Sequence, residues 1–359
     1  MLPQKRNKTC LFASQGRGHL ECGLLVCEGE ESKADSYTRG RMGGTSESFY
    51  QINTLNLSFN KNHTTVTMKI KSIVAIGAIM ALSLVSFRPA DKEVQTDKPF
   101  GGLALYTVRD AMKDARATLE KVAQAGYVNI ESAGYNNGKF YNLSPADFKA
   151  LLDEMKLTPI SAHQGTANFE NIDQQIADLK TAGFKYFVIP VPPMGLFTFD
   201  QVNKRMAMKG GAKNLAEILD KLGEKCAAAG LQLLYHNHDF EFRKDENGVV
   251  PIEYLLENCN PKYVNFQMDL YWVTKAGADP VDYFKRYPGR FKIWHVKDMD
   301  DQGRFAPVGN GKIDFKRILD NKKLSGMQYY FVEQDACFNE TPLEAIVISH
   351  KGLEKIGFK

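Results

Sequence analysis

Imidazole and carboxylate side chains stand at the ends of several short runs of β-branched and aromatic residues. Imidazole nitrogens and carboxylate oxygens without thiolates suit Mn²⁺, Mg²⁺, Co²⁺ or Zn²⁺. If the runs end on one side of the fold, the sequence predicts a site for one divalent metal ion. The histidines concerned are His163, His236, His238 and His295, and the carboxylates are Glu131, Asp269 and Glu333.

Eight such runs alternate with amphipathic stretches of helical period, which predicts eight strand–helix units. The expected strands are 102–107, 127–131, 158–163, 185–191, 231–236, 263–269, 291–296 and 328–333. The expected helices are 112–125, 145–156, 171–182, 211–229, 252–258, 279–286, 314–321 and 342–355. This order predicts an α/β fold, a (β/α)₈ TIM barrel over residues 101–359, with the strand ends at one mouth. A doubly wound open sheet is the alternative, but the first run lacks its glycine-rich phosphate turn.

The part of the chain before the barrel shows no pattern that could form a core. Residues 1–67 are polar and rich in glycine, and we expect them to be unstructured and not part of the natural product. Residues 68–89 hold two lysines and then fifteen uncharged residues, 73–87, which predicts a signal peptide or N-terminal anchor preceding the barrel. The run falls short of the ~20 residues of a comfortable membrane span. We therefore expect an exported protein, periplasmic or secreted, with a linker at 90–100 and no other stable membrane insertion.

Composition excludes several classes of protein. Of 359 residues, 43% are hydrophobic and 25% charged, which argues against a largely disordered chain. The net charge of +4 gives no reason to expect nucleic acid or an anionic membrane as a partner. The six cysteines form no CxxC pair, so a structural zinc site is not expected.

Six segments carry a resemblance to a known family. They read LALYTVRD (103–110), SAHQG (161–165), LLYHNHDFEF (233–242), FQMDLYW (266–272), WHVKD (294–298) and FVEQD (331–335). With them, residues 101–357 resemble the xylose-isomerase-like TIM barrel superfamily, which is related to AP endonuclease family 2. It includes sugar isomerases, epimerases, inosose dehydratase and endonuclease IV. HNHDFEF (236–242) at the fifth expected strand and HVKD (295–298) at the seventh are similar to the subgroup labelled sugar phosphate isomerase/epimerase.

The resemblance implies a metal bound by residues of strands five to eight. Carried over by position, it implies Asp269, His295 and Glu333 as ligands. The fifth strand has His236 where the family often has glutamate. Either His236 replaces that glutamate as a ligand, or His238 or Glu241 reaches the metal instead. Epimerisation by two opposed glutamates is then in doubt, and a one-base isomerisation, dehydration or β-elimination is easier to support.

The expected chemistry is proton transfer next to a carbonyl through a metal-bound enediolate, as in a sugar isomerase or epimerase. Glu333 or His236 is the candidate base, Glu131 a second acid or base, and Lys297 a stabiliser of negative charge. Candidate substrate contacts are His163, which could instead bind a second metal, and His238, Glu241, Tyr106 and Trp272. Structural roles compete: Glu131 could anchor a loop, Lys297 could pair with Asp298, and Tyr106, Trp272 and Trp294 could be packing residues.

Three other functions are weighed against this one. A lyase or dehydratase acting on 3-keto-glycosides or keto-sugars needs the same site, and export favours it because sugar phosphates are scarce outside the cytoplasm. A non-catalytic sugar-binding protein would need no convergent ligands. A DNA endonuclease needs histidines on strand four and after strand six, where this chain has VPPMG and DLYWV. The expected partner is a small sugar or keto-sugar and not nucleic acid, and a homodimer is left open.

Overall fold

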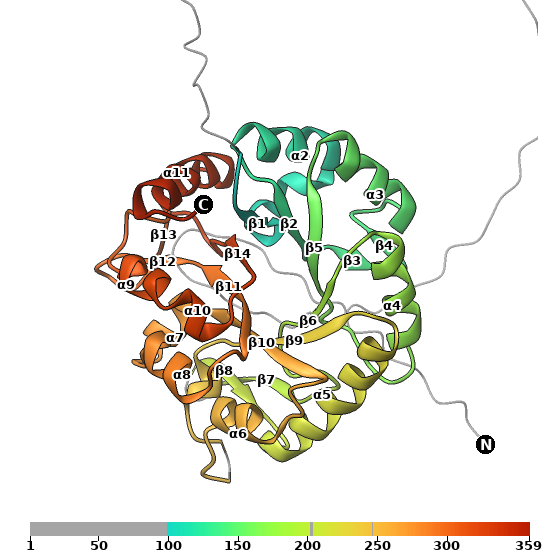
Figure 1. The fold of residues 1–359 in the computed structure, drawn as a ribbon, viewed down its shortest axis with the longest axis vertical. Coiled ribbons are helices and arrows are strands. Elements are labelled where there is room, and N and C mark those ends of the chain that lie inside the picture. Colours follow the sequence, from blue (N-terminus) through green and yellow to red (C-terminus); the bar gives the residue numbers. More distant parts are fainter. Residues whose placement is uncertain (1–98, 202–203, 246) are drawn as a thin grey trace, which may run out of the picture. The chain divides into compact units, whose positions relative to one another are not determined.

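The computed structural model of the chain describes residues 99–359, apart from 202–203 and 246. Eight parallel strands close into a barrel in the order β1-β14-β11-β10-β9-β6-β5-β2 (Figure 1). Their bounds are β1 Gly102–Ala104, β2 Asn129–Ser132, β5 Thr158–His163, β6 Tyr186–Ile189, β9 Gln232–His236, β10 Val264–Asp269, β11 Phe291–Val296 and β14 Tyr329–Val332. The predicted TIM barrel is confirmed.

Helices surround the barrel on its outer side (Figure 1). They are α2 Ala115–Gln124, α3 Pro145–Glu154, α4 Ile172–Thr181, α5 Gly211–Ala228, α6 Pro251–Asn258, α7 Leu270–Lys275, α8 Pro280–Arg286, α9 Phe315–Asp320, α10 Lys322–Ser325 and α11 Pro342–Ile356. Local signals explain their starts. The Ser144 side chain accepts a hydrogen bond from the Asp147 amide at the start of α3. Thr341 and Glu344 form a capping box on α11.

Alternate residues of each barrel strand point inward, and their character changes with height. The lower layer is a small apolar cluster that includes Leu234, Ile293 and Phe331. His236, His295 and Glu333 each follow one of these three residues by two positions and so point to the same side. The barrel is therefore filled by apolar side chains below and carries its polar side chains at the mouth, as in other barrels of this type.

The structure corrects the expected elements at the barrel mouth. The first strand ends at Ala104, and Leu105–Val108 form a 3₁₀ helix, so Tyr106 lies beyond the strand. Three small hairpins were not predicted: β3 Tyr135–Asn136 with β4 Lys139–Phe140, β7 Phe197–Asp200 with β8 Arg205–Met208, and β12 Asp298–Met299 with β13 Phe305–Ala306. The short helices α7 and α10 were also missed. Elements of two to six residues are too short to show a period.

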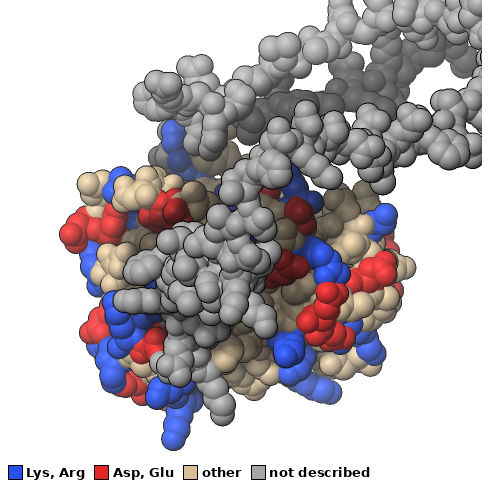
Figure 2. All heavy atoms as spheres, turned by 90° about the horizontal axis from the view of Figure 1, so that it is seen from above, with Lys and Arg blue, Asp and Glu red and all other residues tan. Residues whose placement is uncertain are grey.

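The predictions for residues 1–67 and for the signal segment 68–89 lie outside the described residues, as does nearly all of the 90–100 linker. Within 99–359, no helix that the structure describes is long and apolar enough to cross a membrane. Lys, Arg, Asp and Glu side chains are interspersed over the described atoms visible in Figure 2.

Candidate metal centre and substrate pocket

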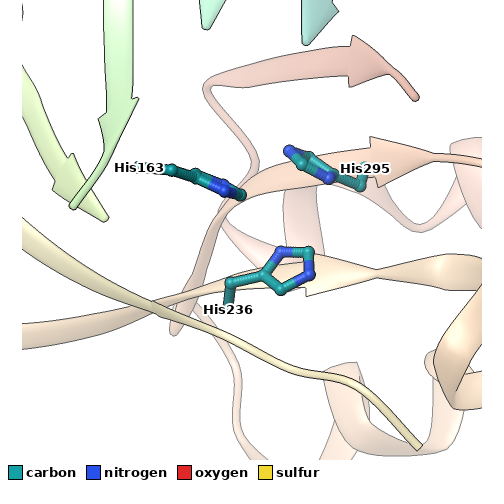
Figure 3. A group of neighbouring side chains, drawn as sticks. All are labelled: His163, His236 and His295. Carbon is teal, nitrogen blue, oxygen red and sulfur yellow. The ribbon is translucent and has the colours of Figure 1, made fainter. Parts of the chain in front are cut away.

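Six predicted site residues from six barrel strands meet at the mouth. His163 ends β5, His236 ends β9, and His295 lies near the end of β11; Figure 3 shows their three rings close together. Asp269 ends β10, Glu131 lies in β2, and Glu333 directly follows β14. The barrel thus brings together side chains that are up to 202 positions apart in the sequence (131 to 333).

These side chains form two groups at the spacing of metal ligands, and His295 belongs to both. One group is Asp269, His295 and Glu333; the other is His163, His236 and His295. Within each group the candidate ligand atoms lie within 4.8 Å of one another. His236 Nε2 is 3.9 Å from Asp269 Oδ2, so the expected fifth-strand ligand borders the carboxylate group without belonging to it.

Asp269 has two functions because it lies where a strand passes into a helix. Its Oδ1 accepts a hydrogen bond of 3.0 Å from the Trp272 amide and thereby caps α7. Its Oδ2 is buried and accepts no hydrogen bond from the described residues, although Lys297 Nζ lies 2.9 Å away. The cap fixes the carboxylate, and the second oxygen is left facing the mouth.

Lys297 is almost fully buried, with 1% of its side chain exposed, and its ammonium group contacts three carboxylates. Nζ lies 2.9 Å from Asp269 Oδ2, 2.7 Å from Glu333 Oε2 and 2.8 Å from Asp335 Oδ1. The alternative pairing with Asp298 does not occur in the described residues: Asp298 accepts hydrogen bonds from backbone N–H groups of the loop at 309–313. Lys297 therefore neutralises the acidic cluster directly.

Glu131 lies beneath the imidazoles and not in the pocket wall. Its Oε1 is 2.6 Å from His295 Nε2 and 3.1 Å from His163 Nε2. Its Oε2 accepts hydrogen bonds from Ser161 Oγ and Gln267 Nε2. With all of these contacts the carboxylate is placed to orient the two rings.

Gln267 extends this network to the fifth strand. Its Oε1 lies 2.8 Å from His163 Nε2 and 2.9 Å from His236 Nδ1. Because this oxygen can only accept, each of these nitrogens donates a proton to it where the bond forms. The bond to His236 Nδ1 leaves His236 Nε2 directed at Asp269. Sequence analysis missed Gln267, although it precedes Asp269 by two residues on the same face of β10.

Charge and burial set the protonation of the groups around His295. Burial opposes its positive charge, but Glu131 and Glu333 raise the pKa of His295 to about 10. Burial likewise opposes the charge of Glu333, yet Lys297 and His295 lower its pKa well below the usual range. Burial works against Lys297 as well, and Asp269, Asp335 and Glu333 raise its pKa well above the usual range. Two cations thus hold the Glu333 carboxylate ionised.

The pKa values of the two imidazoles at the end of the fifth barrel strand, His236 and His238, are lowered and not raised. Burial, assisted by His295 and His238, lowers the pKa of His236 well below its usual value. Burial and the nearby Lys297 lower the pKa of His238 to about 3. Both rings are therefore neutral near pH 7, which is the state in which imidazole binds a metal or a hydroxyl group.

A cavity of about 460 Å³ opens above these groups. Its polar lining includes His163, His236, His238, Lys297, Glu333 and Asp335, and its aromatic lining includes Tyr106, Tyr135, Phe197 and Trp272. His238 Nδ1 and Trp272 Nε1 are buried and have no hydrogen-bond partner among the described residues. They are therefore free to bind a polar ligand at this wall, as expected for a sugar pocket.

Two residues considered in the sequence analysis lie outside the pocket, and one pocket residue was not predicted. Glu241 is fully buried outside the pocket lining, where it accepts hydrogen bonds from the Tyr235 hydroxyl and the His238 amide. Trp294 is fully buried and stacks on Phe284. Asp335 lines the pocket but was not predicted, although it follows Glu333 by two residues in the FVEQD segment.

Comparison with known proteins agrees with this fold. The model of the xylose isomerase-like TIM barrel family matches residues 119–334. The chain belongs to this family, whose relatives include sugar isomerases, epimerases and dehydratases. It is 28% identical over 163 residues to an inosose dehydratase of Lacticaseibacillus casei, covering 40% of this chain and 53% of that protein. The chain thus spans about half the length of that relative.

A second relative is matched over more of its length. An inosose dehydratase of Clostridium perfringens is 24% identical over 261 residues, which cover 62% of this chain and 86% of that protein. Among solved structures, a sugar phosphate isomerase/epimerase from Parabacteroides distasonis is 27% identical, with a TM-score of 0.59 over 74% of this chain and 97% of that one. The IOLI protein, solved with a zinc atom, shares the fold at 16% identity and a TM-score of 0.55, over 72% and 97%.

Proposed function

We propose that this chain is a metal-dependent enzyme that removes a proton from the carbon beside a carbonyl group of a sugar or keto-sugar. The observation that carries the proposal is Glu333, a pocket-lining carboxylate held by His295 and Lys297 beside Asp269. A base for this reaction must lie within hydrogen-bond reach of the substrate carbon's proton. Membership of the sugar isomerase, epimerase and dehydratase family supports the same reaction class.

The donor set fits a divalent ion. The mouth and the layer beneath it hold four carboxylates, and Lys297 and a protonated His295 supply two positive charges. Asp269, Glu333 and His295 would hold the ion, and His295 would lose its Nδ1 proton on binding it; the buried Asp269 Oδ2 accepts no hydrogen bond from the described residues. When bound, the ion would polarise the carbonyl group and stabilise the negative charge that develops on its oxygen. The zinc atom of the IOLI protein, which shares this fold, supports the assignment.

Glu333 is placed to act as the base through one oxygen. Its Oε2 is engaged by His295 Nδ1 at 2.9 Å and by Lys297 Nζ at 2.7 Å. Its Oε1 is therefore the oxygen that can take the proton from the substrate. Lys297 and His295 keep this carboxylate ionised near pH 7, as a base must be.

The position of the second acid favours dehydration or β-elimination over epimerisation. Epimerisation needs a proton acceptor and a donor on opposite faces of one carbon. Here the two pocket-lining carboxylates, Glu333 and Asp335, come from one segment, and Glu131 lies below the imidazoles. Burial raises the pKa of Asp335 to about 6, so its acid form is accessible near neutral pH. Asp335 can then protonate the oxygen that leaves from the carbon next to the one deprotonated by Glu333.

The experiment that tests this proposal follows candidate substrates by NMR in D₂O with the Mn²⁺-supplemented full chain. An inosose, a 3-keto-glucoside and a simple ketose are compared. We expect loss of the proton beside the carbonyl with release of the neighbouring oxygen substituent, abolished in Glu333→Gln. Interconversion of ketose and aldose would instead establish an isomerase, and binding without any exchange would establish a sugar-binding protein.

The place where this reaction occurs is a separate proposal. The charged and then apolar run at 68–87 supports export, with cleavage or anchoring within residues 68–89. Amino-terminal sequencing of the natural product tests it. A natural product that begins between residues 68 and 100 agrees with export, whereas one that retains residues 1–67 contradicts it.

A further inference from the structure

A second cavity, of about 490 Å³, lies beside the substrate pocket. Its lining includes the cations Arg109, Lys113 and Lys139 and the amides Asn136, Asn137 and Asn142. No Asp or Glu belongs to the lining among the described residues. We call it the basic cavity.

The basic cavity and the substrate pocket share a wall. Along the segment that enters the β3–β4 hairpin, Ala133 and Tyr135 line the pocket, whereas Gly134 and Asn136 line the basic cavity. The same alternation occurs after β1, where Tyr106 lines the pocket and Arg109 the basic cavity. Tyr106, which is 40% exposed, therefore lies between the pocket and Arg109, whose guanidinium packs on its ring.

The positive charge of the basic cavity is not neutralised within the described part of the chain. Lys113 and Lys139 make no ion pair there. Arg109 donates hydrogen bonds of 2.9 Å to the backbone carbonyls of Tyr106 and Asp335, and its guanidinium lies 4.3 Å from the Tyr106 ring centre. These contacts fix the arginine without cancelling its charge. The result is an arginine held by two hydrogen bonds and flanked by two exposed lysines, which suits an oxyanion.

We propose that the basic cavity binds an anionic group of the substrate, a phosphate, a sulfate or a carboxylate, while the sugar ring occupies the pocket. This inference rests on the proposed function, because it assigns the substrate class of that site. Charges of one sign lining a cavity raise the local concentration of the oppositely charged ligand. The three amides add hydrogen-bond donors around the same anion.

The test compares three sugars as ligands of the full chain by calorimetry at low ionic strength. Glucose 6-phosphate and glucuronate carry the two kinds of anion, and glucose is the neutral control. Inorganic phosphate, followed by ³¹P NMR, probes the cavity without any sugar. The variant is Lys113→Gln/Lys139→Gln, and the matched control is Lys351→Gln/Lys355→Gln, which removes the same charge at a different cavity. Because all four lysines are exposed, both variants should fold, which circular dichroism checks.

We expect phosphate and at least one anionic sugar to bind more tightly than glucose to the wild type. Binding of the anions should weaken about tenfold in Lys113→Gln/Lys139→Gln and stay unchanged in the control. The anionic sugar whose affinity falls more in Lys113→Gln/Lys139→Gln shows whether the cavity prefers a phosphate or a carboxylate group. Equal binding of all ligands, or an equal loss in both variants, would overturn the proposal. These binding results need no metal and no turnover, so they are separate from the test of Glu333.

Discussion

Oε1 of Glu131 lies 2.6 Å from Nε2 of His295, and Nδ1 of the same ring lies 2.9 Å from Glu333 Oε2. Glu131 therefore contacts one nitrogen of the His295 ring from below. Glu333, which belongs with His295 and Asp269 to a candidate ligand group, contacts the other nitrogen. A histidine that binds a metal through one nitrogen commonly donates its other N–H to a carboxylate, which fixes the ring and its tautomer. We therefore propose that Glu131 positions the His295 ring, whose Nδ1 would face the ion once its proton is lost.

Replacing Glu131 by glutamine tests this relationship. The amide cannot hold the Nε2–H group as the carboxylate does, so metal affinity should fall about 10- to 100-fold. Calorimetric titration of the apo protein with Mn²⁺ or Zn²⁺ measures the change. Ser161→Ala, which removes one neutral donor from Glu131 Oε2, should have a smaller effect. Unchanged metal affinity in Glu131→Gln would show that His295 does not depend on this carboxylate.

Lys297→Met should destabilise the metal-free protein more than the metal-bound one. The change leaves Asp269, Glu333 and Asp335 without their shared ammonium partner, and breaking a buried ion pair costs about 3–5 kcal/mol of unfolding free energy. A divalent ion supplies positive charge to two of these carboxylates and should restore part of the loss. Urea unfolding with EDTA and with Mn²⁺ measures both effects.

Lys292→Met is the matched control for Lys297, because Lys292 lies on the same strand and makes no ion pair within the described residues. It should change stability little, with or without metal. If the Lys297 variant were equally stable in EDTA and in Mn²⁺, the carboxylates would not be shared between the ammonium group and the ion.

Glu241 should make the stability of the protein depend on pH. Burial raises its pKa in the folded protein to about 7, above the ordinary value of 4.5. Between these values the folded protein keeps a proton that the unfolded chain releases, so rising pH favours unfolding. Stability should fall by about 3 kcal/mol from pH 4.5 to 7 through this group alone.

The comparison with Glu241→Gln isolates this contribution, since the glutamine does not titrate. Urea unfolding of both proteins at several pH values between 4.5 and 8 should give curves that converge or cross as the wild type loses stability. A constant difference between the two proteins over this range would mean that Glu241 ionises in the folded state as it does in the unfolded chain.

Much of the barrel could be predicted because its strands and larger helices are long enough to show their periods. The strand at 158–163 and the one at 291–296 were predicted to the residue. The hairpins at the mouth could not be, because β3 and β4 have two residues each and depend on contacts across the loop. This matters for function, because the loop that carries them forms the wall between the pocket and the basic cavity.

The candidate site was predictable by residue type but not by arrangement. Strand ends identified Asp269, His295 and Glu333, which the structure brings together. The sequence could not indicate that Glu131 lies beneath the imidazoles or that Glu241 turns away, because both depend on which face of a strand end or loop is buried. Asp335 was missed because its partner, Lys297, comes from a different strand.

Metal content is the most direct test of the central claim that Asp269, His295 and Glu333 hold a divalent ion. The full chain is incubated with Mn²⁺, freed of excess ion and analysed for metals, beside Asp269→Ala, His295→Ala and His236→Ala. We predict a divalent ion in near-stoichiometric amount in the wild type, its loss in the first two variants, and weakened retention in His236→Ala. A wild type without metal, or full retention in both Asp269→Ala and His295→Ala, would contradict the assignment.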